Sequence, residues 1–396
     1  MQPYLNAEEA AALLGVSKAT LYAYVSRGKL QPHQAGAAGR GSLYAREELD
    51  ALCLQKGRGR KPRDQTPPNP ATLVNTALSC IEDGEVYYRG RAASALAESE
   101  SLEDVARWLW QFDGLDPFAR APVTPHPLWA HALHALQDRS LAERASCLLA
   151  LAQLSIPGSA WLTQPQAQAE ACANLLRYQL AGLLGRPPSE APLHEQLRDA
   201  WHLDAAATEL VRGMLVICAD NIVNPTCYVA RVLASLGAPL GSALQGGMSN
   251  VWGIIEGGTP EQVEAQWAHW QAAPDLTAAV ASKLEQGDKV FGFYHSMFPH
   301  GDGRVRWLLS RIAIPPEAAR LMAAMQALTG FLPNVDFALV AVRRALGLPP
   351  EAAFVILHVA RTVGLLANVL EQRRSGLRLR AGAHYAGPRP QSDTGA

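Results

Sequence analysis

Apolar residues recur at helical spacing along most of the chain, whereas the alternating patterns typical of β-strands are scarce. From residue 71 onward the helical segments follow one another almost without a break, separated by loops such as LGRPPSEAP and ALGLPPEA. This pattern predicts a large all-α body of about fifteen or more helices. No run of about 18 apolar residues is free of charge and proline, so we expect no membrane-spanning helix.

The N-terminal segment follows a different pattern, with two short helices and a glycine-rich stretch. In NAEEAAALLGVSKATLYAYVSRGKL, Asn6 and Glu9 make a capping box that starts the first helix. Ser17 is placed to cap the second helix, and Gly28 is placed to end it. The stretch HQAGAAGRGSLYAREELDAL then predicts a hairpin wing and a third helix. The pattern is that of a small winged helix-turn-helix domain.

Composition divides the chain into three units. Residues 1–54 hold the helix-turn-helix pattern, and residues 71–396 hold the helical body. Residues 55–70 between them, QKGRGRKPRDQTPPNP, are basic and rich in glycine and proline. Such a composition does not bury apolar surface, so we expect a flexible linker.

The charge of the chain is nearly balanced overall but unevenly distributed. In total, 35 Lys and Arg stand against 36 Asp and Glu. Residues 1–63 carry 10 Lys and Arg against 5 Asp and Glu, a net of +5, and the rest of the chain carries 25 against 31, a net of −6. A small basic unit on a larger acidic one suggests a nucleic-acid-binding module attached to a separate globular body.

The cysteines and histidines indicate neither a disulfide framework nor a metal site. Six cysteines are scattered without CxxC spacing, which favours reduced thiols in a cytoplasmic protein. The start MQPYLNAEEA lacks the basic residues and apolar run of a secretory signal. His295 and His300 lie close in sequence, but without a third ligand at helical spacing we predict no metal.

The N-terminal unit resembles the MerR/excisionase type of DNA-binding domain over residues 4–54, through the pattern AAxLLGVSxxTLYxYVxxGxL. The resemblance implies that the second helix enters the major groove and that the wing meets phosphate or the minor groove. A protein–protein interaction module is the alternative interpretation. The candidate DNA contacts are Lys18, Thr20, Tyr22 and Arg27 on the second helix and Arg40 near the wing tip.

Polar residues interrupt the apolar body at four places, which are the candidates for a functional site. They are CADNIVNPTCYVAR at 218–231, SALQGGMSNV at 242–251, FGFYHSMFPHGDGR at 291–304, and the segment 332–372, in which Asp336 and Arg361 break apolar helices. A buried carboxylate or guanidinium needs a partner, so each place could hold a ligand. For any one residue taken alone, a structural ion pair is the alternative.

The body resembles the citrate synthases, and the similar motifs occur in the same order along the chain. The stretch NTALSCIEDGEVYYRGRAASALAESESLEDVARWLW is similar to the family's opening hairpin with its YRGY motif, and GFYHSMFPHGDGR to its GFGH loop. Three further stretches, PNVDFALVAVRRALGLPP, VARTVGLLANVLEQ and RLRAGAHYAGP, resemble PNVDFYSG, ARTVGW and the RPRA–YVGP segment. The resemblance implies an all-α fold with a large and a small subdomain. A MerR-like domain before such a body also resembles a bacterial subgroup of the family.

The resemblance implies a homodimer that condenses an acyl-CoA with a 2-oxo acid, typically acetyl-CoA or propionyl-CoA with oxaloacetate. The CoA thioester is then a co-substrate, and no cofactor is bound permanently. Asp336 stands where the family's general base removes a proton from the thioester, and His295 where the family polarises the oxaloacetate carbonyl. Guanidinium groups hold the carboxylates in the family, and the matching residues are Arg304, Arg361 and Arg380, the last acting across the dimer interface.

Several positions depart from the family pattern. Gln245 stands where we expect the enol-stabilising histidine, and Asn221 where we expect a second oxaloacetate-binding histidine. An amide still donates a neutral hydrogen bond, but it does not relay a proton at physiological pH. Tyr294 replaces the glycine of GFGH, Gly382 replaces an arginine of RPR, and residues 338–340 differ from YSG.

Three interpretations follow. In the first, the chain is a slow or substrate-shifted citrate or 2-methylcitrate synthase, which the retained base, histidine and arginines favour. In the second, it is an inactive sensor of a dicarboxylate or CoA thioester that regulates through DNA, which the two lost imidazoles and the basic N-terminal unit favour. In the third, it is a non-catalytic subunit that pairs with an active paralogue in a heterodimer. The sequence leaves the acyl group, the DNA sequence and the partner open.

Overall fold

The computed structural model describes residues 4–34, 42–46, 48–49, 74–156, 163–221, 223–249, 260–295, 297–380 and 387. Three features predicted from the sequence lie outside these residues: Arg40 at the wing tip, the linker 55–70, and the departure at Gly382. The domain boundaries at residues 54 and 70 therefore stay predictions.

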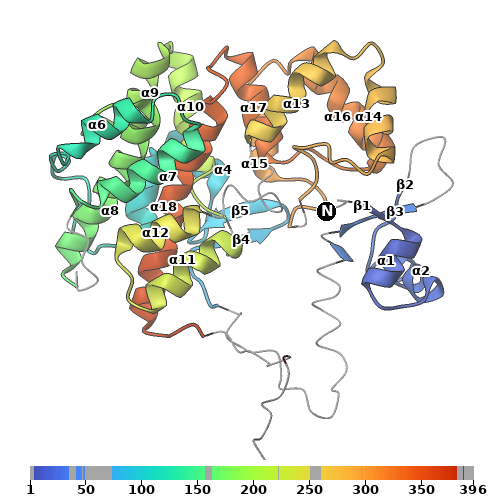
Figure 1. The fold of residues 1–396 in the computed structure, drawn as a ribbon, viewed down its shortest axis with the longest axis horizontal. Helices are drawn as coiled ribbons and strands as arrows, with labels where there is room; N and C mark the ends of the chain where they lie inside the picture. Colours follow the sequence, from blue (N-terminus) through green and yellow to red (C-terminus); the bar gives the residue numbers. More distant parts are fainter. Residues whose placement is uncertain are drawn as a thin grey trace, which may run out of the picture.

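In its described residues, the N-terminal unit contains the helices α1 and α2, a three-stranded antiparallel sheet, and helical residues at 46 and 48–49 (Figure 1). The capping box is present at α1 (Ala7–Leu13), where the Asn6 side chain accepts the backbone N–H of Glu9. Ser17 caps α2 (Lys18–Ser26), as predicted. The strands β1 (Tyr4–Asn6), β2 (His33–Gln34) and β3 (Ser42–Ala45) lie in the order β1-β3-β2, so a strand that precedes the first helix completes the sheet of the wing.

A short antiparallel hairpin opens the described part of the body. It consists of β4 (Ser79–Glu82), β5 (Glu85–Tyr88) and β6 (Arg91–Ala92). Asp83 and Gly84 connect β4 to β5 with φ values of 50° and 77°, which is the geometry that favours an Asp-Gly pair in a two-residue turn. A Cβ on Gly84 would lie 2.5 Å from the carbonyl oxygen of Gly301, so only glycine allows the turn to approach that loop so closely.

The described remainder of the body is helical and forms two groups (Figure 1). The larger group surrounds α18 (Ala352–Ser375) and contains α4 (Ala93–Ser99), α5 (Leu102–Trp110), α6 (Leu128–Ala135), α7 (Leu141–Ala152), α8 (Pro165–Leu184), α9 (Leu193–Trp201), α10 (Ala205–Ile217), α11 (Pro225–Ser235) and α12 (Leu240–Met248). The smaller group contains α13 (Pro260–Ala272), α14 (Leu276–Glu285), α15 (Gly303–Leu309), α16 (Pro316–Thr329) and α17 (Val335–Ala345). The predicted all-α fold with a large and a small subdomain is confirmed.

The centre of the larger group is α18, which contacts α5, α8, α10, α11 and α12. Most of its residues are buried on all sides, because helices cover nearly its whole circumference. Among the described residues it is the one helix whose length and hydropathy match a membrane span, and 89% of that window is buried inside the body. Burial of this kind is typical of the core helix of a large helical domain.

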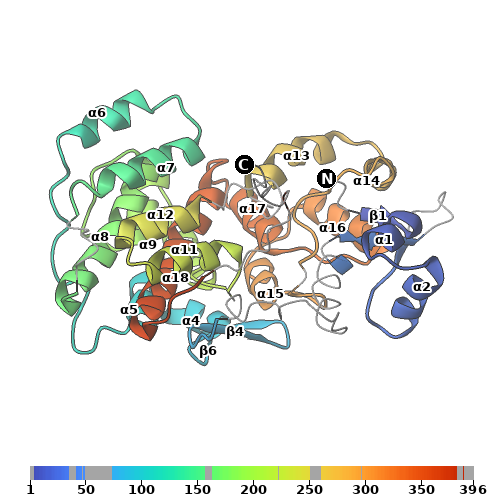
Figure 2. The same ribbon diagram turned by 60° about the horizontal axis from the view of Figure 1, so that its bottom comes forward.

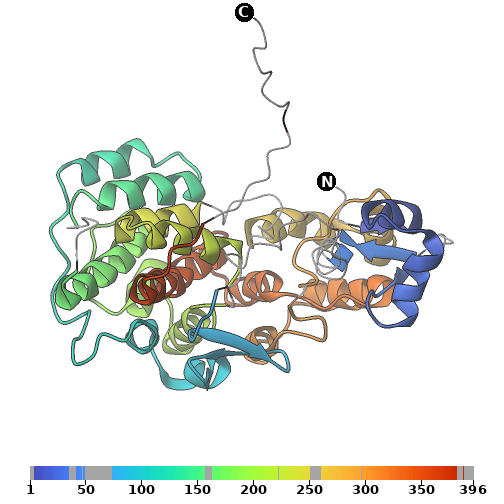
Figure 3. The same cartoon turned by 90° about the horizontal axis from the view of Figure 1, so that it is seen from below.

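The N-terminal unit packs against the smaller group, and three views agree on this placement (Figures 1, 2 and 3). Strand β2 contacts α16, and the ring of Tyr4 in β1 stacks on Phe331 with centroids 5.2 Å apart. Figure 1 shows α1 and α2 on the side of the sheet that faces away from α14 and α16. The strands β1 and β2 are therefore part of the surface through which the unit contacts the body.

Candidate active site

Asp336 lies in the first turn of α17, in a partly buried position, and the residues that follow it up to Val342 are apolar. The Asn334 side chain caps this helix and accepts the Asp336 N–H at 3.1 Å. Burial raises the pKa of Asp336 to about 7, although Arg304, Arg361 and Lys289 lie near enough to oppose the rise. A carboxylate with a pKa near neutrality can accept a proton and release it again at physiological pH.

His295 lies on the loop that precedes α15. Its Nδ1 accepts the backbone N–H of Met297 at 3.2 Å, so a neutral ring carries its proton on Nε2. Burial, and after it the charge of Arg304, lowers the pKa of His295 to about 4, which keeps the ring neutral at pH 7. A neutral imidazole with Nε2–H exposed to a ligand can donate a hydrogen bond to a carbonyl oxygen.

Arg304 is fully buried near the start of α15 and is held by Asp302, which caps that helix. Two nitrogens of its guanidinium meet the Asp302 carboxylate, Nε with Oδ1 at 3.0 Å and Nη2 with Oδ2 at 2.7 Å. The third nitrogen, Nη1, is buried without a hydrogen-bond partner among the described residues. A buried, charged donor without a partner is suited to an anionic oxygen of a ligand.

Arg361 approaches the same place from the larger group of helices, on α18. Within the described part of the chain its guanidinium forms neither a hydrogen bond nor an ion pair. Its charge acts on Asp336 and His295 in the smaller group and on Asp220 in the larger group. The structure thus brings Asp336, His295, Arg304 and Arg361 together where the two groups meet.

The β4–β5 hairpin contacts both groups of helices and supports this arrangement. The N–H of Gly303 donates to the carbonyl of Gly84 at 2.7 Å, so the loop that carries Arg304 rests on the hairpin tip. At the other end of the hairpin, the Ser79 hydroxyl donates to Oδ2 of Asp220 at 2.8 Å. One rigid element therefore fixes the distance between the loop of the smaller group and the end of α10 in the larger group.

Asn221 lies beside this anchor and is buried, with 5% of its surface exposed. Its backbone carbonyl lies 2.7 Å from the same Ser79 hydroxyl, so this carbonyl and the Asp220 carboxylate share one donor. The neighbouring Asp220 lies against α18 at Gly364, where no side chain would fit, and Gly364 follows Arg361 by less than one helical turn. Asn221 is therefore next to a residue that interacts with Arg361, as its predicted role requires; the role itself stays a prediction.

The amide of Gln245 is directed away from this cluster, towards α7. Its Oε1 accepts from Nε2 of Gln153 at 3.0 Å, and its Nε2 donates to the carbonyl of Ser146 at 3.4 Å. Gly247 lies about 200° around the axis of α12 from Gln245 and faces Leu365 of α18, so Gln245 is on the opposite side of the helix. Among the described residues, the structure does not bring Gln245 together with Asp336, and its predicted contact with the substrate stays a prediction.

Arg380 is exposed and lies beyond the end of α18. The segment that carries it is attached to the larger group, since the Leu379 N–H donates to Oγ of Ser235 at 3.1 Å. Its predicted role requires a second subunit, because the resemblance assigns this arginine to the partner's site. The single chain therefore leaves that role as a prediction.

Most of the predicted DNA contacts lie on the exposed side of α2. Lys18 forms an ion pair with Glu8 at 3.0 Å, and the Tyr22 side chain is 52% exposed. Lys18 and Tyr22 are four residues apart, so they share one face of the helix. Arg27 is exposed at the helix end, whereas Thr20 is partly buried and its hydroxyl lies 2.9 Å from that of Ser17.

Three residues near the site were missed by the sequence analysis. Lys289 precedes the His295 loop, and its charge acts on both His295 and Asp336; its only signal in the sequence was its closeness to that loop. Gln31 and Glu48 come from the N-terminal unit, and nothing in the sequence pairs them with the body.

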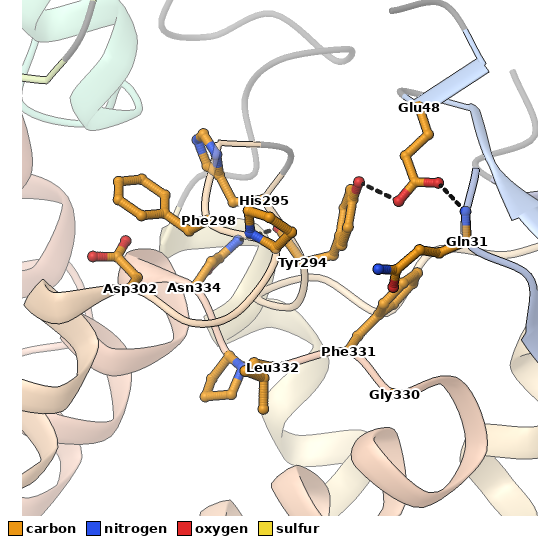
Figure 4. Close-up of a pocket in the computed structure, with 12 residues that line it drawn as sticks. Gln31, Glu48, Tyr294, His295, Phe298, Asp302, Gly330, Phe331, Leu332 and Asn334 are labelled. Atoms are coloured by element: carbon orange, nitrogen blue, oxygen red, sulfur yellow. Dashed lines mark hydrogen bonds between the residues drawn. The ribbon is translucent and has the colours of Figure 1, made fainter. Parts of the chain in front are cut away.

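Gln31 and Glu48 of the N-terminal unit line a pocket that lies between this unit and the body (Figure 4). The pocket is lined by Gln31, Glu48, Tyr294, His295, Phe298, Pro299, Asp302, Gly330, Phe331, Leu332, Pro333 and Asn334. Figure 4 shows Glu48 between Gln31 and the Tyr294 hydroxyl, with His295 and Asp302 on the opposite side. The pocket therefore opens next to the candidate active site.

Comparison with known proteins assigns both parts of the chain. The family model described as citrate synthase, C-terminal domain, matches residues 70–381, and the model described as helix-turn-helix domain matches residues 4–56. A protein of Mycobacterium tuberculosis named "Putative citrate synthase 2" is 26% identical over 283 residues, which are 67% of this chain and 72% of the relative. The 2-methylcitrate synthase of the same species is 25% identical over 194 residues, 46% of this chain and 49% of the relative.

Two solved structures share the fold. Citrate synthase from Thermotoga maritima superposes with a TM-score of 0.66 at 19% identity, covering 81% of this chain and 95% of that chain. Citrate synthase from Thermoplasma acidophilum, in a ternary complex with carboxymethyl coenzyme A and oxaloacetate, superposes with a TM-score of 0.64 at 17% identity, covering 82% and 96%. At these identities the superpositions support the fold alone.

Proposed function

The chain belongs to the citrate synthase family, and we propose that it condenses an acyl-CoA, either acetyl-CoA or propionyl-CoA, with oxaloacetate. The observation that carries the proposal is the meeting of a carboxylate of raised pKa, a neutral imidazole and two arginines with free hydrogen-bonding capacity. These are a base, a donor for a carbonyl oxygen and two anchors for carboxylates, which a condensation of this kind requires.

Asp336 acts as the base in this proposal. It removes a proton from the carbon next to the thioester carbonyl, and the resulting enol or enolate attacks the keto carbon of oxaloacetate. His295 donates from Nε2 to the keto oxygen as negative charge develops there, which a neutral ring can do without first losing a proton. Water then cleaves the thioester of the product and releases the free thiol of CoA.

Arg304 and Arg361 bind the two carboxylates of oxaloacetate. Asp302 already holds one side of the Arg304 guanidinium, so Nη1 is left to meet the ligand in a fixed direction. Arg361 has its whole guanidinium available among the described residues. Arg380 completes the site from the second subunit of a homodimer, or of a heterodimer with a paralogue. The CoA thioester is a co-substrate, and the proposal needs no resident cofactor.

We further propose that the activity is weaker than, or shifted from, that of the family, because amides stand at 221 and 245 in place of the expected histidines. One hydrogen-bond donor to a developing oxyanion is worth about 3 to 4 kcal/mol, or about two to three powers of ten in rate. Gln245 can serve as that donor only if its amide exchanges Gln153 and Ser146 for the substrate.

The N-terminal unit binds DNA in this proposal, through Lys18, Tyr22 and Arg27 on the exposed side of α2, with Thr20 and the wing residue Arg40 in supporting contacts. The family match to a helix-turn-helix domain and the net charge of +5 over residues 1–63 support it. We place the protein in the cytoplasm, because five cysteines of the described chain are free thiols.

Release of CoA thiol from acetyl-CoA or propionyl-CoA with oxaloacetate, measured beside calorimetric binding of oxaloacetate, tests the proposal. Turnover with either thioester supports the enzyme and identifies the acyl group. Binding of oxaloacetate without turnover supports the inactive sensor of a dicarboxylate or CoA thioester. Absence of both overturns the two ligand-based functions and leaves the non-catalytic partner subunit.

A further inference from the structure

The N-terminal unit is attached to the loop that carries His295. The Tyr294 hydroxyl donates to Oε1 of Glu48 at 2.8 Å, and Oε2 of the same carboxylate accepts the backbone N–H of Gln31 at 3.2 Å (Figure 4). Gln31 follows α2 closely in sequence, so Glu48 connects the end of the proposed recognition helix to the residue next to His295. The bond from Tyr294 to Glu48 joins the two units at the site, and the bond from Gln31 fixes the Glu48 carboxylate within the N-terminal unit.

Tyr294 is also tied to the segment that leads to Asp336. Its N–H donates to the carbonyl of Leu332 at 2.9 Å, and Nδ2 of Asn334 reaches its carbonyl at 3.5 Å. Asn334 is the residue that caps α17 at Asp336. A shift of Tyr294 therefore acts on both the imidazole and the carboxylate of the candidate site.

The conformation of Tyr294 indicates that this position is specialised. Its φ of 65° lies in the left-handed region, where glycine is favoured and where the resembling family motif has a glycine. Phe331 holds the Tyr294 ring, with centroids 4.7 Å apart, and Phe331 in turn stacks on Tyr4 of the N-terminal unit. The chain thus keeps a disfavoured backbone conformation at a residue whose side chain hydrogen-bonds to the other unit.

We propose that Glu48 and Tyr294 link the DNA-binding unit to the active site, such that oxaloacetate binding releases the N-terminal unit from the body. The inference rests on the proposed function for its ligand. Glu48 and His295 line the same pocket, so a dianion held by His295 and Arg304 brings like charge towards the Glu48 carboxylate. Charges closer than the screening length of about 10 Å at moderate salt repel each other, and the repulsion weakens the docked state.

The docked unit keeps Lys18 and Tyr22 exposed, so docking fixes the orientation of α2 without covering it. A recognition helix held in one orientation meets DNA with less loss of rotational freedom than a tethered one. Release by oxaloacetate therefore lowers DNA affinity. Because coupling between two ligands is reciprocal, DNA lowers the affinity for oxaloacetate by the same factor.

Hydrogen exchange on the full-length protein, with and without oxaloacetate, tests the link. Gln31 and Tyr294 both line the pocket between the units, which opens when the N-terminal unit is released, so we expect oxaloacetate to speed exchange at their amides by about fivefold or more. Tyr294→Phe keeps the ring but removes the bond to Glu48, so exchange is already fast without ligand. Glu48→Gln keeps both contacts, because its amide oxygen can accept the Gln31 N–H while its NH2 group donates to the Tyr294 hydroxyl oxygen, but it removes the charge. The unit therefore stays docked, and oxaloacetate no longer releases it.

Tyr178→Phe is the matched control, because it removes a tyrosine hydroxyl bond, to the carbonyl of Val123, inside the larger group. This variant should respond to oxaloacetate like the wild type. Oxaloacetate that binds by calorimetry but leaves exchange at Gln31 unchanged or slower overturns the inference while the proposed function stands. Equal exchange in Tyr294→Phe and Tyr178→Phe overturns the link itself, whatever the ligand does. Failure of oxaloacetate to bind overturns the proposed function, and the ligand-driven release with it.

Discussion

Arg231 and Arg304 are both buried arginines, with 1% and 0% of their surfaces exposed, but their surroundings differ. All three guanidinium nitrogens of Arg231 have partners in the protein, whereas Nη1 of Arg304 has none among the described residues. Burial of a charge is therefore not what distinguishes a functional arginine in this body. The distinguishing feature is a hydrogen-bonding position that the fold leaves unfilled.

The network around Arg231 is closed. Nε donates to Oδ1 of Asn368 at 2.6 Å, and the two other nitrogens reach Gln372, Thr76 and Glu371. The buried surroundings act against ionisation of Glu371, but the hydrogen bonds from the Ala77 N–H, Arg231 and Thr76 hold its pKa below the ordinary value. The network joins α11 and α18 to the segment before the hairpin, which is a structural role.

The same helix serves both clusters. The closed network uses the last turns of α18, and Arg361 in the open cluster lies near its middle. Because one rigid helix positions both, the packing of the closed network supports the placement of Arg361. Variants of the two clusters should therefore separate stability from ligand binding.

The largest effect is expected for Asp336→Asn. Loss of the base should lower turnover by about two to four powers of ten. At pH 8 the same variant should melt at a higher temperature than the wild type. The pKa of Asp336 is raised in the folded state, so the unfolded chain loses this proton at lower pH and folding stability falls as pH rises from about 4 to 7.

Thiol release and thermal unfolding measure the two effects of Asp336→Asn. Asp302→Asn is not a suitable variant for testing the base, because the Asp302 carboxylate holds Arg304. A variant that retains turnover within a factor of a few would remove Asp336 from the mechanism.

Arg231→Leu is expected to lower the free energy of unfolding by about 3 to 5 kcal/mol, because it leaves the partly buried Glu371 without its partner. Affinity for oxaloacetate should stay near that of the wild type below the melting temperature. Denaturant unfolding and calorimetry check both statements. Weaker oxaloacetate binding in a folded Arg231→Leu protein would show that the closed network is part of the site.

Arg361→Leu is expected to do the opposite. Charge-assisted hydrogen bonds contribute about 1.5 to 3 kcal/mol, so oxaloacetate affinity should fall by about one to two powers of ten. The melting temperature should change little, because no hydrogen bond or ion pair among the described residues depends on this guanidinium. A large loss of stability with unchanged affinity would assign Arg361 to the core.

The pH dependence of turnover should follow the base. Since the pKa of Asp336 is raised to about 7, the rate should fall about tenfold per pH unit below that value. His295 has a pKa lowered to about 4 and stays neutral over this range. A rate that is flat between pH 5 and 8 at saturating oxaloacetate would contradict the assignment of the base.

Gln245→His is expected to have the smallest effect. The Gln245 side chain is directed towards α7 rather than towards the cluster, and a histidine that keeps this direction does not restore the missing donor, so turnover should change by less than about twofold, equivalent to roughly 0.4 kcal/mol. Asn221→His, beside the anchor at Asp220, is the companion variant and should act more strongly. A tenfold gain from Gln245→His would instead support the role that the family resemblance assigns to this position.

Much of the fold was predictable because it depends on local patterns. The capping box at Asn6 and the Ser17 cap were read from adjacent residues, and both are present. The helical body follows from apolar spacing along the sequence. The family resemblance selected Asp336, His295, Arg304 and Arg361, which the structure brings together.

The rest depends on relations that no local pattern encodes. The direction of the Gln245 amide depends on the rotation of α12, and one residue of offset turns a side chain by about 100°. The bond between Tyr294 and Glu48 joins residues 246 positions apart. Whether a buried arginine has a free nitrogen depends on every neighbour that folds around it, as Arg231 and Arg304 illustrate.

The position of α18 in the chain also has a consequence for how the protein is made. The helix around which α5, α8, α10, α11 and α12 pack spans Ala352–Ser375, so the ribosome produces it after all of them. At about 5 to 20 residues per second, the first helices of the body wait roughly 15 to 60 seconds for their central partner. During that time the faces that pack on α18 have no native surface to cover them, so the larger group completes its core only when synthesis is nearly finished. Completion of the larger group is in that respect a late event in translation.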